Sequence, residues 1–255
     1  MSINFKNAIV RLPSEYIKNA ISSKGLSPNF SKVKKQHQAY TLTLEETGLN
    51  VKILDTLRDL PDSVFVEDPA LIFDKICIIL RPGVDTRFEE ASNLKIEISK
   101  LFDQFFTIED GYIEGGDILR INNHFIIGIS SRTDENGANS LKKIIEKNGG
   151  TSEIAITPDN ILHFKSECSL LDEETILATK NLIETGFFDK KYRIIKVPDS
   201  EENGANCLRI NEQLLVPKGY PRLLDILSRD YKVRVLDVTE MEKVDAGLSC
   251  LSLRW

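Results

Sequence analysis

A hairpin pattern that recurs four times along the chain constrains its fold more than any other feature. The stretches "GGDILRINNHFIIGIS" (115–130) and "GANCLRINEQLLVPKG" (204–219) share Leu-Arg-Ile-Asn, a two-residue polar turn and a short apolar run. The stretches "EDPALIFDKICIILRPG" (67–83) and "SECSLLDEETILAT" (166–179) have the same form. The four lie 48, 50 and 39 residues apart when they are aligned on their turn residues, Asp74, Asn122, Asp172 and Asn211. Such a period is typical of proteins built from repeated units.

A helical pattern and then a short apolar strand follow the hairpins. Thr86 and Glu89 have the spacing of a capping box, and apolar residues then recur at intervals of three and four. Glycines at 149–150 are typical of the position after a helix. We predict helices over 88–105, 138–150 and 221–230, and connecting strands over 106–109 and 193–198. The repeating unit is therefore a hairpin, a helix and a strand.

The two ends of the chain complete the pattern. Residues 7–25 predict a strand and then a helix that begins at Pro13 and Ser14 and ends at Gly25. Residues 247–255 predict a strand with no helix after it, and 26–50 a loop-rich and then helical cover. The first and last strands can together supply a fifth hairpin, which closes a ring and removes exposed sheet edges. We expect one α/β domain over residues 1–255.

Composition excludes several classes of function. The 255 residues carry a formal net charge of −6, which argues against nucleic acid or an anionic membrane as the main partner. We see no signal peptide and no apolar run long enough to span a bilayer. The four cysteines are widely separated, so we expect a cytoplasmic protein without disulfides. His163 and Cys168 are close in sequence, but no second pair completes a zinc site, so we expect no metal.

Polar residues near the start of each hairpin should gather around the axis of the ring. They are Glu67, Asp68, Glu114, Asp117, His163, Asn206 and Cys250. Each has an ordinary structural explanation: Cys250 as a small apolar core residue, His163 as a hydrogen-bonded core imidazole, and the acids as turn residues. Burying a cysteine, a histidine and several carboxylates together is costly, however, so equivalent positions in a ring favour a functional site.

Seven segments in order resemble the dimethylarginine dimethylaminohydrolase family, which is related to arginine deiminase and the amidinotransferases. They are "DSVFVEDPA" (62–70), "RPGVDTR" (81–87), "EGGD" (114–117), "GISSRTDENGA" (128–138), "LHFKS" (162–166), "NGANCL" (203–208) and "EKVDAGLSC" (242–250). The resemblance implies a five-bladed α/β-propeller, the pentein fold, with pseudo-fivefold repeats. It implies hydrolysis of free Nω-methylated arginine to citrulline plus methylamine or dimethylamine, without a metal or organic cofactor.

The resemblance also implies roles for individual residues. Cys250 would attack the guanidinium carbon, His163 would protonate the departing amine and then activate water, and Glu114 would hold the guanidinium. The substrate would be bound by Asp68 with Glu67 in support, by Arg87 and Arg132 at its carboxylate, and by Asp62 at its amino group, with help from the backbone near Val244 and Ile21. Asp245 is a weaker candidate for orienting His163.

These roles are chemically consistent. A guanidinium is a poor electrophile, which favours a thiolate, and its basic leaving amine needs a general acid. A bound cation should also lower the pKa of the thiol. Two arginines suit the one free carboxylate of an amino acid. For partners we expect this small molecule, no nucleic acid and no membrane, and we allow for a homodimer.

Two alternatives remain open at this stage. Arginine deiminases have an aspartate two positions after the catalytic histidine, and here that position is Lys165. Without this carboxylate, one guanidinium nitrogen of the substrate has no acidic partner, which leaves room for methyl groups. This favours methylated arginine over arginine as the substrate. An arginine deiminase-like or other guanidino or ureido hydrolase is the nearer alternative. A non-catalytic propeller that serves as a binding module is the other, because fold alone does not imply catalysis.

Overall fold

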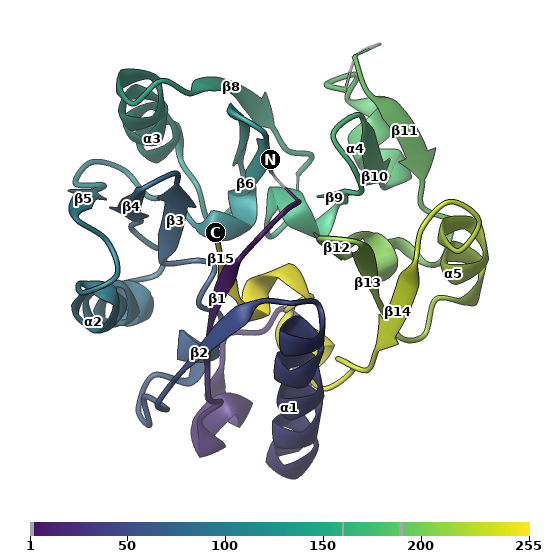
Figure 1. Cartoon of the computed structure of the whole chain (residues 1–255), viewed down its shortest axis with the longest axis horizontal. Coiled ribbons are helices and arrows are strands. Elements are labelled where there is room, and N and C mark those ends of the chain that lie inside the picture. Colours follow the sequence, from purple (N-terminus) through teal and green to yellow (C-terminus); the bar gives the residue numbers. More distant parts are fainter. Residues whose placement is uncertain (1–2, 160, 189–190) are drawn as a thin grey trace.

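Five three-stranded sheets surround a common axis in the computed structural model, which describes residues 3–159, 161–188 and 191–255 (Figure 1). The first sheet combines the two ends of the chain: β15 (Leu253–Arg254), β1 (Asn7–Arg11) and β2 (Asn50–Leu54). The second consists of β3 (Ala70–Phe73), β4 (Ile76–Ile79) and β5 (Gln104–Thr107). The third consists of β6 (Ile118–Ile121), β7 (His124–Ile129) and β8 (Thr151–Ile156). The other two are β9 (Cys168–Leu170), β10 (Thr175–Ala178) and β11 (Arg193–Lys196); and β12 (Leu208–Ile210), β13 (Gln213–Pro217) and β14 (Val233–Leu236).

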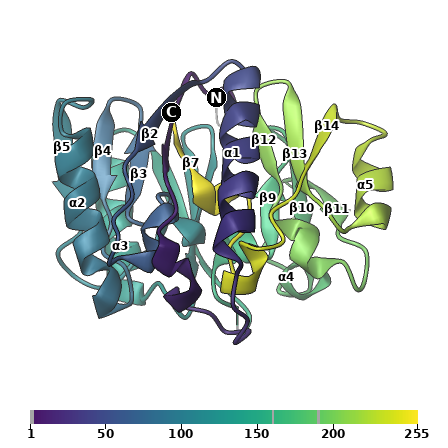
Figure 2. The ribbon, with the colours of Figure 1, turned by 90° about the horizontal axis from the view of Figure 1, so that it is seen from below.

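The helices lie on the outside of the ring, and both termini lie at one end of it (Figures 1 and 2). They are α1 (Phe30–Glu46), α2 (Phe88–Ile98), α3 (Glu135–Lys147), α4 (Lys180–Glu184) and α5 (Pro221–Leu227). Each helix connects the middle strand of a sheet to its outer strand. Those two strands run parallel, and a parallel pair needs such a crossover. The predicted five-bladed α/β-propeller and its hairpin–helix–strand unit are confirmed.

The hairpin turns explain why the repeat is visible in the sequence. Asp74, Asn122 and Asn211 have φ values of 53°, 56° and 51°, a left-handed conformation that short polar residues tolerate. The two-residue turn predicted at Asp172 is wrong. There β9 and β10 are joined by residues 171–174, and the Asp172 carboxylate accepts hydrogen bonds from the Glu174 N–H and the Tyr231 hydroxyl. This hairpin therefore has a longer loop held by side chains.

The two ends of the chain close the ring. Ala8 pairs with Arg254 and Ile9 with Leu253 in an antiparallel ladder, while β1 pairs in parallel with β2. The strand predicted over 247–255 is correct only for Leu253–Arg254. Residues Ser249–Leu251 form a 3-10 turn instead, labelled η8, so the chain bends immediately before it enters the sheet.

Three helix predictions need correction. The helix predicted over 88–105 ends at Ile98, and Phe105 lies in the strand β5. Residues 14–25 form only the short 3-10 helix η1 (Glu15–Asn19), capped by Ser14 as predicted; Ala20 after it is extended, and the Ile21 N–H is bonded to Asp62. The expected capping box at Thr86 does not form. Asp85–Arg87 is a 3-10 turn that leads directly into α2, whose first turn has no side-chain cap.

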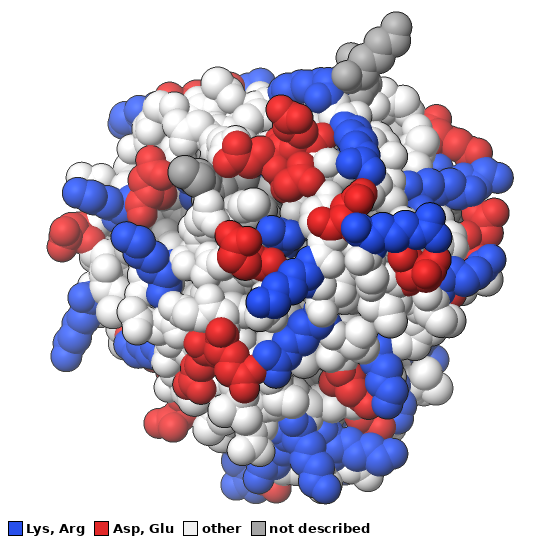
Figure 3. Space-filling view, turned by 45° about the vertical axis from the view of Figure 1, so that its right-hand side comes forward, with Lys and Arg blue, Asp and Glu red and all other residues white. Residues whose placement is uncertain are grey.

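The apolar core is divided among the blades. Buried side chains form five clusters, each made by neighbouring units and their helices. Within the described residues, no helix combines the length and the apolarity needed to cross a membrane. One face of the molecule has acidic and basic side chains interspersed (Figure 3). The buried apolar side chains thus lie between neighbouring blades, and polar side chains can occupy the axis of the ring.

Candidate active site

Cys250 lies in the turn η8, just before the strand that closes the ring. Its side chain is buried, and its carbonyl oxygen accepts a hydrogen bond from the Glu67 N–H (3.3 Å). Arg254 stabilises the turn by donating from Nη1 to the carbonyl oxygens of Ser249 (2.9 Å) and Ser252 (2.6 Å). The cysteine is therefore held from β15 and from the loop before β3.

Asn206 ties the cysteine turn to the segment that carries His163. Its Oδ1 accepts from the Ser249 N–H (2.9 Å), and its Nδ2 donates to the Lys165 carbonyl oxygen (3.0 Å) and to Ser249 Oγ (3.1 Å). Gly247 packs against this amide so closely that a Cβ there would lie 2.3 Å from Asn206 Cγ. The small residues before Cys250 allow the two segments to approach.

His163 is fixed by two buried carboxylates. Its Nε2 lies 2.7 Å from Glu114 Oε2. Asp117 accepts hydrogen bonds from the Phe164 N–H (2.7 Å) and from the Thr133 (2.7 Å) and Ser130 (2.8 Å) hydroxyls. The backbone next to His163 is thus anchored by Asp117, while Glu114 orients the imidazole.

A chain of buried charges continues from Glu114. Arg87 Nη1 lies 3.0 Å from Asp68 Oδ2 and 3.4 Å from Glu114 Oε2, and Arg87 Nε donates to Glu90 (3.0 Å). Arg132 Nη1 lies 3.4 Å from Glu114 Oε1. Asp68 also accepts from the Gly116 N–H (3.1 Å). The cluster balances carboxylates against two guanidinium groups, as burial of charge requires.

These neighbours shift the pKa values of the reactive groups. Burial alone would lower the pKa of His163, but the carboxylates of Asp68, Glu114 and Asp117 raise it to about 9. Burial alone would raise the pKa of Glu114, but the hydrogen bond from His163 and the charge of Arg87 lower it to about 2. Burial, with the charges of Asp68 and Glu67, raises the pKa of Cys250 to about 12. At neutral pH the site therefore holds an imidazolium–carboxylate pair beside a neutral thiol.

Most of the predicted site residues line one small cavity, which we name the amino-acid cavity. Its walls include Ile21, Asp62, Asp68, Arg87, Arg132, His163, Val244 and Cys250. Glu114 is fully buried behind His163 and is not among the lining residues. Its oxygens are occupied by His163, Arg87, Arg132 and the Gly83 N–H.

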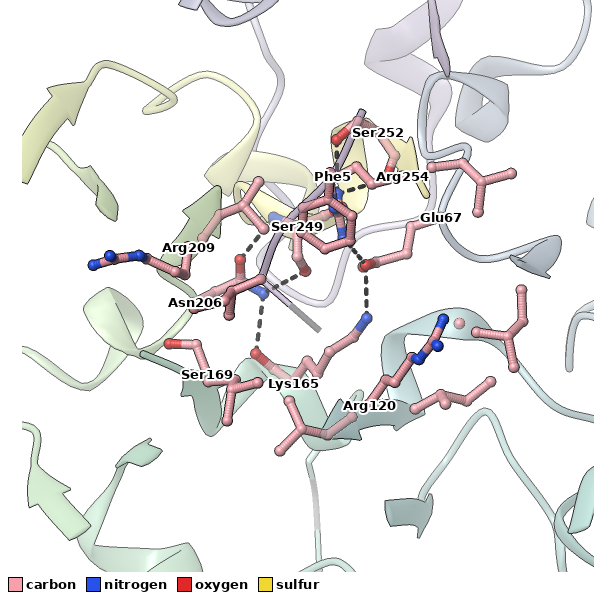
Figure 4. A pocket seen from close by; sticks show the side chains of 18 of the residues that line it. Phe5, Glu67, Arg120, Lys165, Ser169, Asn206, Arg209, Ser249, Ser252 and Arg254 are labelled. Carbon is pink, nitrogen blue, oxygen red and sulfur yellow. Dashed lines mark hydrogen bonds and ion pairs between the residues drawn. The ribbon is translucent and has the colours of Figure 1, made fainter. Parts of the chain in front are cut away.

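Glu67 does not line the amino-acid cavity but a separate one, which we name the axial cavity (Figure 4). Its Oε1 accepts from Lys165 Nζ (2.7 Å) and from Arg254 Nη2 (2.6 Å). Asn206 and Ser249 lie next to this group and form part of the same wall (Figure 4). The structure therefore does not bring Glu67 into the amino-acid cavity with Asp68.

Residues 21–24, which we name the entrance segment, lie over the site. The Ile21 N–H donates to both carboxylate oxygens of Asp62 (3.1 and 3.3 Å). Ser23 is bonded to Asp245 through its N–H (2.5 Å) and its hydroxyl (3.0 Å), and Lys24 Nζ lies 3.8 Å from Asp245 Oδ1. Asp245 has a left-handed backbone (φ 59°). It thus anchors the entrance segment; no hydrogen bond joins it to His163 among the described residues.

Sequence reasoning missed Glu90 and Arg254. Glu90 holds Arg87 from one turn away in the chain, at the spacing of an (i, i+3) pair at the start of α2. The spacing of Arg87 and Glu90 in the sequence could have indicated this ion pair. Arg254 contacts Glu67 across 187 positions of sequence, and nothing local marks it.

One group of side chains has the geometry to hold a cation. The ligand atoms of Asp68, Glu114 and His163 lie within 4.8 Å of one another. Two of the carboxylate oxygens already contact Arg87, so a guanidinium occupies the neighbourhood that a metal ion would need.

The comparisons with known proteins agree with this geometry. A sequence model described as arginine deiminase matches residues 56–214, which is more than half of the chain, so the chain belongs to the arginine deiminase family of enzymes. The N(G),N(G)-dimethylarginine dimethylaminohydrolase of Pseudomonas aeruginosa is 34% identical over 98% of this chain and 100% of its own. The chain belongs to the dimethylarginine dimethylaminohydrolase family.

Solved structures show the same relationship. A cysteine-to-serine variant of the Pseudomonas aeruginosa enzyme in complex with citrulline has a TM-score of 0.94 and 33% identity, and covers 98% of this chain and 99% of that one. A histidine-to-glycine variant of a dimethylarginine dimethylaminohydrolase, an adduct with S-methyl-L-thiocitrulline, also has a TM-score of 0.94, with 33% identity over 98% of this chain and 100% of that one. The family's fold is thus retained over nearly the whole chain.

Replacing Asn206 by alanine should destabilise the protein by about 3 kcal/mol, because buried groups of Ser249 and Lys165 lose their partners. Urea denaturation measures this free energy of unfolding. Asn203→Ala, an exposed amide in the same segment, is the control and should change it by less than about 0.5 kcal/mol. Equal effects of the two substitutions would contradict the bridging role of Asn206.

The raised pKa of His163 predicts a loss of stability at alkaline pH. Between its ordinary value of 6.5 and about 9, the folded protein keeps a proton on His163 that the unfolded chain releases. The free energy of unfolding should therefore fall as pH rises through this window, by up to about 1.4 kcal/mol per pH unit.

Urea denaturation at several pH values tests this with His163→Gln, which should flatten the decline. His124→Gln, at the partly exposed first residue of β7, is the control and should retain the decline. A decline of the same size in His163→Gln would show that another group is responsible.

Proposed function

We propose that this protein hydrolyses free Nω-methylated arginine to citrulline and methylamine or dimethylamine, with Cys250 as covalent nucleophile. The observation that carries the proposal is the cavity that joins Cys250 and the His163–Glu114 pair to Asp68 and two arginines. Family membership and the relatives named for this reaction support it. The site needs no metal ion or organic cofactor for this chemistry.

Asp68 is suited to bind the substrate guanidinium. In the structure it already accepts a charge-assisted hydrogen bond from a guanidinium group, that of Arg87 (3.0 Å). Arg132 and Arg87 are suited to the α-carboxylate, because both guanidinium groups line the amino-acid cavity. Asp62 would take the α-amino group, helped by the backbone of Val244 and Ile21 in the same cavity.

Substrate entry requires movement of the entrance segment. The amino-acid cavity has a volume of about 20 Å³, which is too small for an arginine side chain. The contacts of Ile21 with Asp62 and of Ser23 with Asp245 would break on opening. The carboxylate of Asp62 would then be free to meet the substrate.

The reaction has two stages. The Cys250 thiolate adds to the guanidinium carbon and forms a C–S bond; the C–N bond to the methylated nitrogen then breaks, and the nitrogen leaves as a neutral amine after His163 protonates it. Water, deprotonated by His163, attacks the same carbon. The C–S bond breaks, which returns the thiolate and yields the urea of citrulline.

Two features tune these steps. The hydrogen bond from His163 Nε2 to Glu114 keeps the imidazole protonated and oriented, so Glu114 acts through His163 rather than on the guanidinium directly. The thiol pKa of about 12 means that little thiolate exists before a cation is bound beside it. Binding of the cationic substrate therefore lowers the pKa of the thiol, which releases its proton to solvent and becomes the attacking thiolate.

Lys165 favours methylated arginine over arginine. It lies two residues after His163 and pairs with Glu67 at 2.7 Å, so it adds no carboxylate to the guanidinium site. The second candidate is deimination of arginine, which the match to the arginine deiminase model favours. We further infer that residues 1–255 act as one catalytic domain in the cytoplasm, a location that suits four unpaired cysteines.

Citrulline release from dimethylarginine, monomethylarginine and arginine tests the proposal. We expect turnover of a methylated form at least 100-fold faster than of arginine, and at least a 1000-fold loss in Cys250→Ser. Cys77→Ser, in the core of β4, is the control and should stay active. Preferred turnover of arginine would identify the second candidate, and full activity of Cys250→Ser would refute the nucleophile.

Alkylation kinetics test whether the thiol is neutral before binding. Below its pKa of about 12, the rate at which iodoacetamide inactivates the enzyme should rise tenfold per pH unit from pH 7.5 to 10. Turnover should already be near its maximum at pH 7.5. An alkylation rate that levels off by pH 8 would mean that the thiolate forms without substrate.

A further inference from the structure

A group of three largely buried charges adjoins the cysteine turn, and we name it the charge cluster. It consists of Glu67, Lys165 and Arg254, whose side chains are 7%, 13% and 10% exposed. Glu67 Oε1 accepts from both Lys165 Nζ (2.7 Å) and Arg254 Nη2 (2.6 Å) (Figure 4). Two cations share one carboxylate, so the cluster has a net charge of +1.

Backbone contacts hold the cluster next to Cys250. The Glu67 N–H donates to the Cys250 carbonyl oxygen (3.3 Å). Arg254 Nη1 donates to carbonyl oxygens on either side of the cysteine, those of Ser249 (2.9 Å) and Ser252 (2.6 Å). The cluster is therefore fixed beside the turn that carries the thiol.

The charges of the cluster interact with that of the Cys250 thiolate. Burial and the charge of Asp68 raise the pKa of Cys250, and within the cluster Glu67 raises it further while Lys165 lowers it. Burial lowers the pKa of Arg254, but the negative charges of Glu67 and of the Cys250 thiolate raise it. An electrostatic interaction acts on both partners, so Arg254 in turn favours the thiolate.

The surroundings of Arg254 hold its charge in place. The centroid of the Phe5 ring lies 5.9 Å from Arg254 Cζ. Arg254 Nη1 also donates to Ser252 Oγ (2.7 Å), which is bonded in turn to the hydroxyl of the fully buried Tyr40 (2.6 Å). A charge in such surroundings acts more strongly on its neighbours than a charge in water.

Building on the proposed function, we propose that Arg254 is a positioning residue of the reaction, which holds a positive charge next to Cys250 and stabilises its thiolate. Lys165 offsets the charge of Glu67, so Arg254 supplies the charge that the cluster has in excess. Arg254 does not line the amino-acid cavity, so it acts through the nucleophile and not on the substrate.

Single substitutions change the net charge of the cluster in opposite directions. Arg254→Gln and Lys165→Gln lower it from +1 to 0, and Glu67→Gln raises it to +2. We expect one charge to move the pKa of the thiol by about one unit, which changes the thiolate fraction about tenfold, while the accompanying change in nucleophilicity cancels about threefold of this. At about pH 8, iodoacetamide should therefore alkylate Cys250 about threefold more slowly in the first two variants and about threefold faster in the third. Mass spectrometry of the labelled peptide measures these rates.

A purely structural role predicts another order, because a loosened turn exposes the thiol and speeds alkylation in all three variants. Arg254→Lys keeps the charge and should restore most of the rate lost in Arg254→Gln. Arg209→Gln is the matched control: it removes a cation that lines the same axial cavity but points away from the cluster, and it should leave the rate unchanged (Figure 4). A rate in Arg254→Gln equal to or above that of the wild type overturns the proposal. If that variant does not fold, Glu67→Gln and Lys165→Gln decide, because their rates should differ about tenfold and a difference below about threefold overturns the proposal.

Turnover separates this proposal from the proposed function. Arg254→Gln should lower kcat for methylarginine by about threefold or more and change KM by less than about twofold, because the substrate contacts in the amino-acid cavity remain. An unchanged kcat overturns the proposal. Absence of citrulline release from every methylated arginine with the wild-type chain instead contradicts the proposed function, and the alkylation rates then decide on the charge cluster alone.

Discussion

The antiparallel pairing of β1 with β15 is the constraint on which the candidate site depends. It joins the two ends of the chain through Ala8–Arg254 and Ile9–Leu253, and it closes the ring. Cys250 lies three residues before this strand, so the pairing itself brings the thiol to the axis. Arg254 then reaches back from the strand to the carbonyl oxygen of Ser249 and to Glu67. The nucleophile is in place only when the whole ring has formed.

The buried charges at the axis follow a second constraint. An isolated carboxylate in this environment would be protonated, so each one has a cationic partner or several donors. Asp68, Glu90 and Glu114 share Arg87. Asp117 has no such ion pair among the described residues and accepts three hydrogen bonds instead. Arg87 thereby gives Asp68 a cationic partner within the protein itself. A carboxylate that already accommodates a guanidinium group needs little rearrangement to accept another.

The fold could be predicted from the sequence where local chemistry repeats. Asp74, Asn122 and Asn211 adopt left-handed turns that few residue types tolerate, and this is what made three of the hairpins recognisable. The fourth was also found, but its loop uses side-chain hydrogen bonds that leave no fixed signature. The helix expected after Ser14 fails because the Ile21 N–H bonds to Asp62, a contact across 41 positions that local propensity cannot encode.

Some residues of the candidate site could be predicted from the sequence, and others could not. Cys250, His163 and Asp68 lie in short segments whose residues resemble a known family, and the cavity brings them together. Glu67 was expected beside Asp68 because the two are adjacent in sequence, but both lie in a turn before β3, and their side chains line different cavities. Its carboxylate accordingly faces Lys165 in the axial cavity. Arg254 acts through its contact with Glu67, 187 positions away in sequence, which forms only when the ring has closed.

The position of Lys165 connects substrate choice to the state of the thiol. The negative charge of Glu67 disfavours the Cys250 thiolate, and the positive charge of Lys165 favours it. Because these two side chains form an ion pair, their effects on the thiol partly cancel. In the proposed mode of binding, the substrate guanidinium is held by Asp68, which lines the amino-acid cavity, and some of its nitrogens have no carboxylate partner. Those nitrogens are the ones that can carry alkyl groups, so the loss of one carboxylate contact is also what allows the substrate to be larger than arginine.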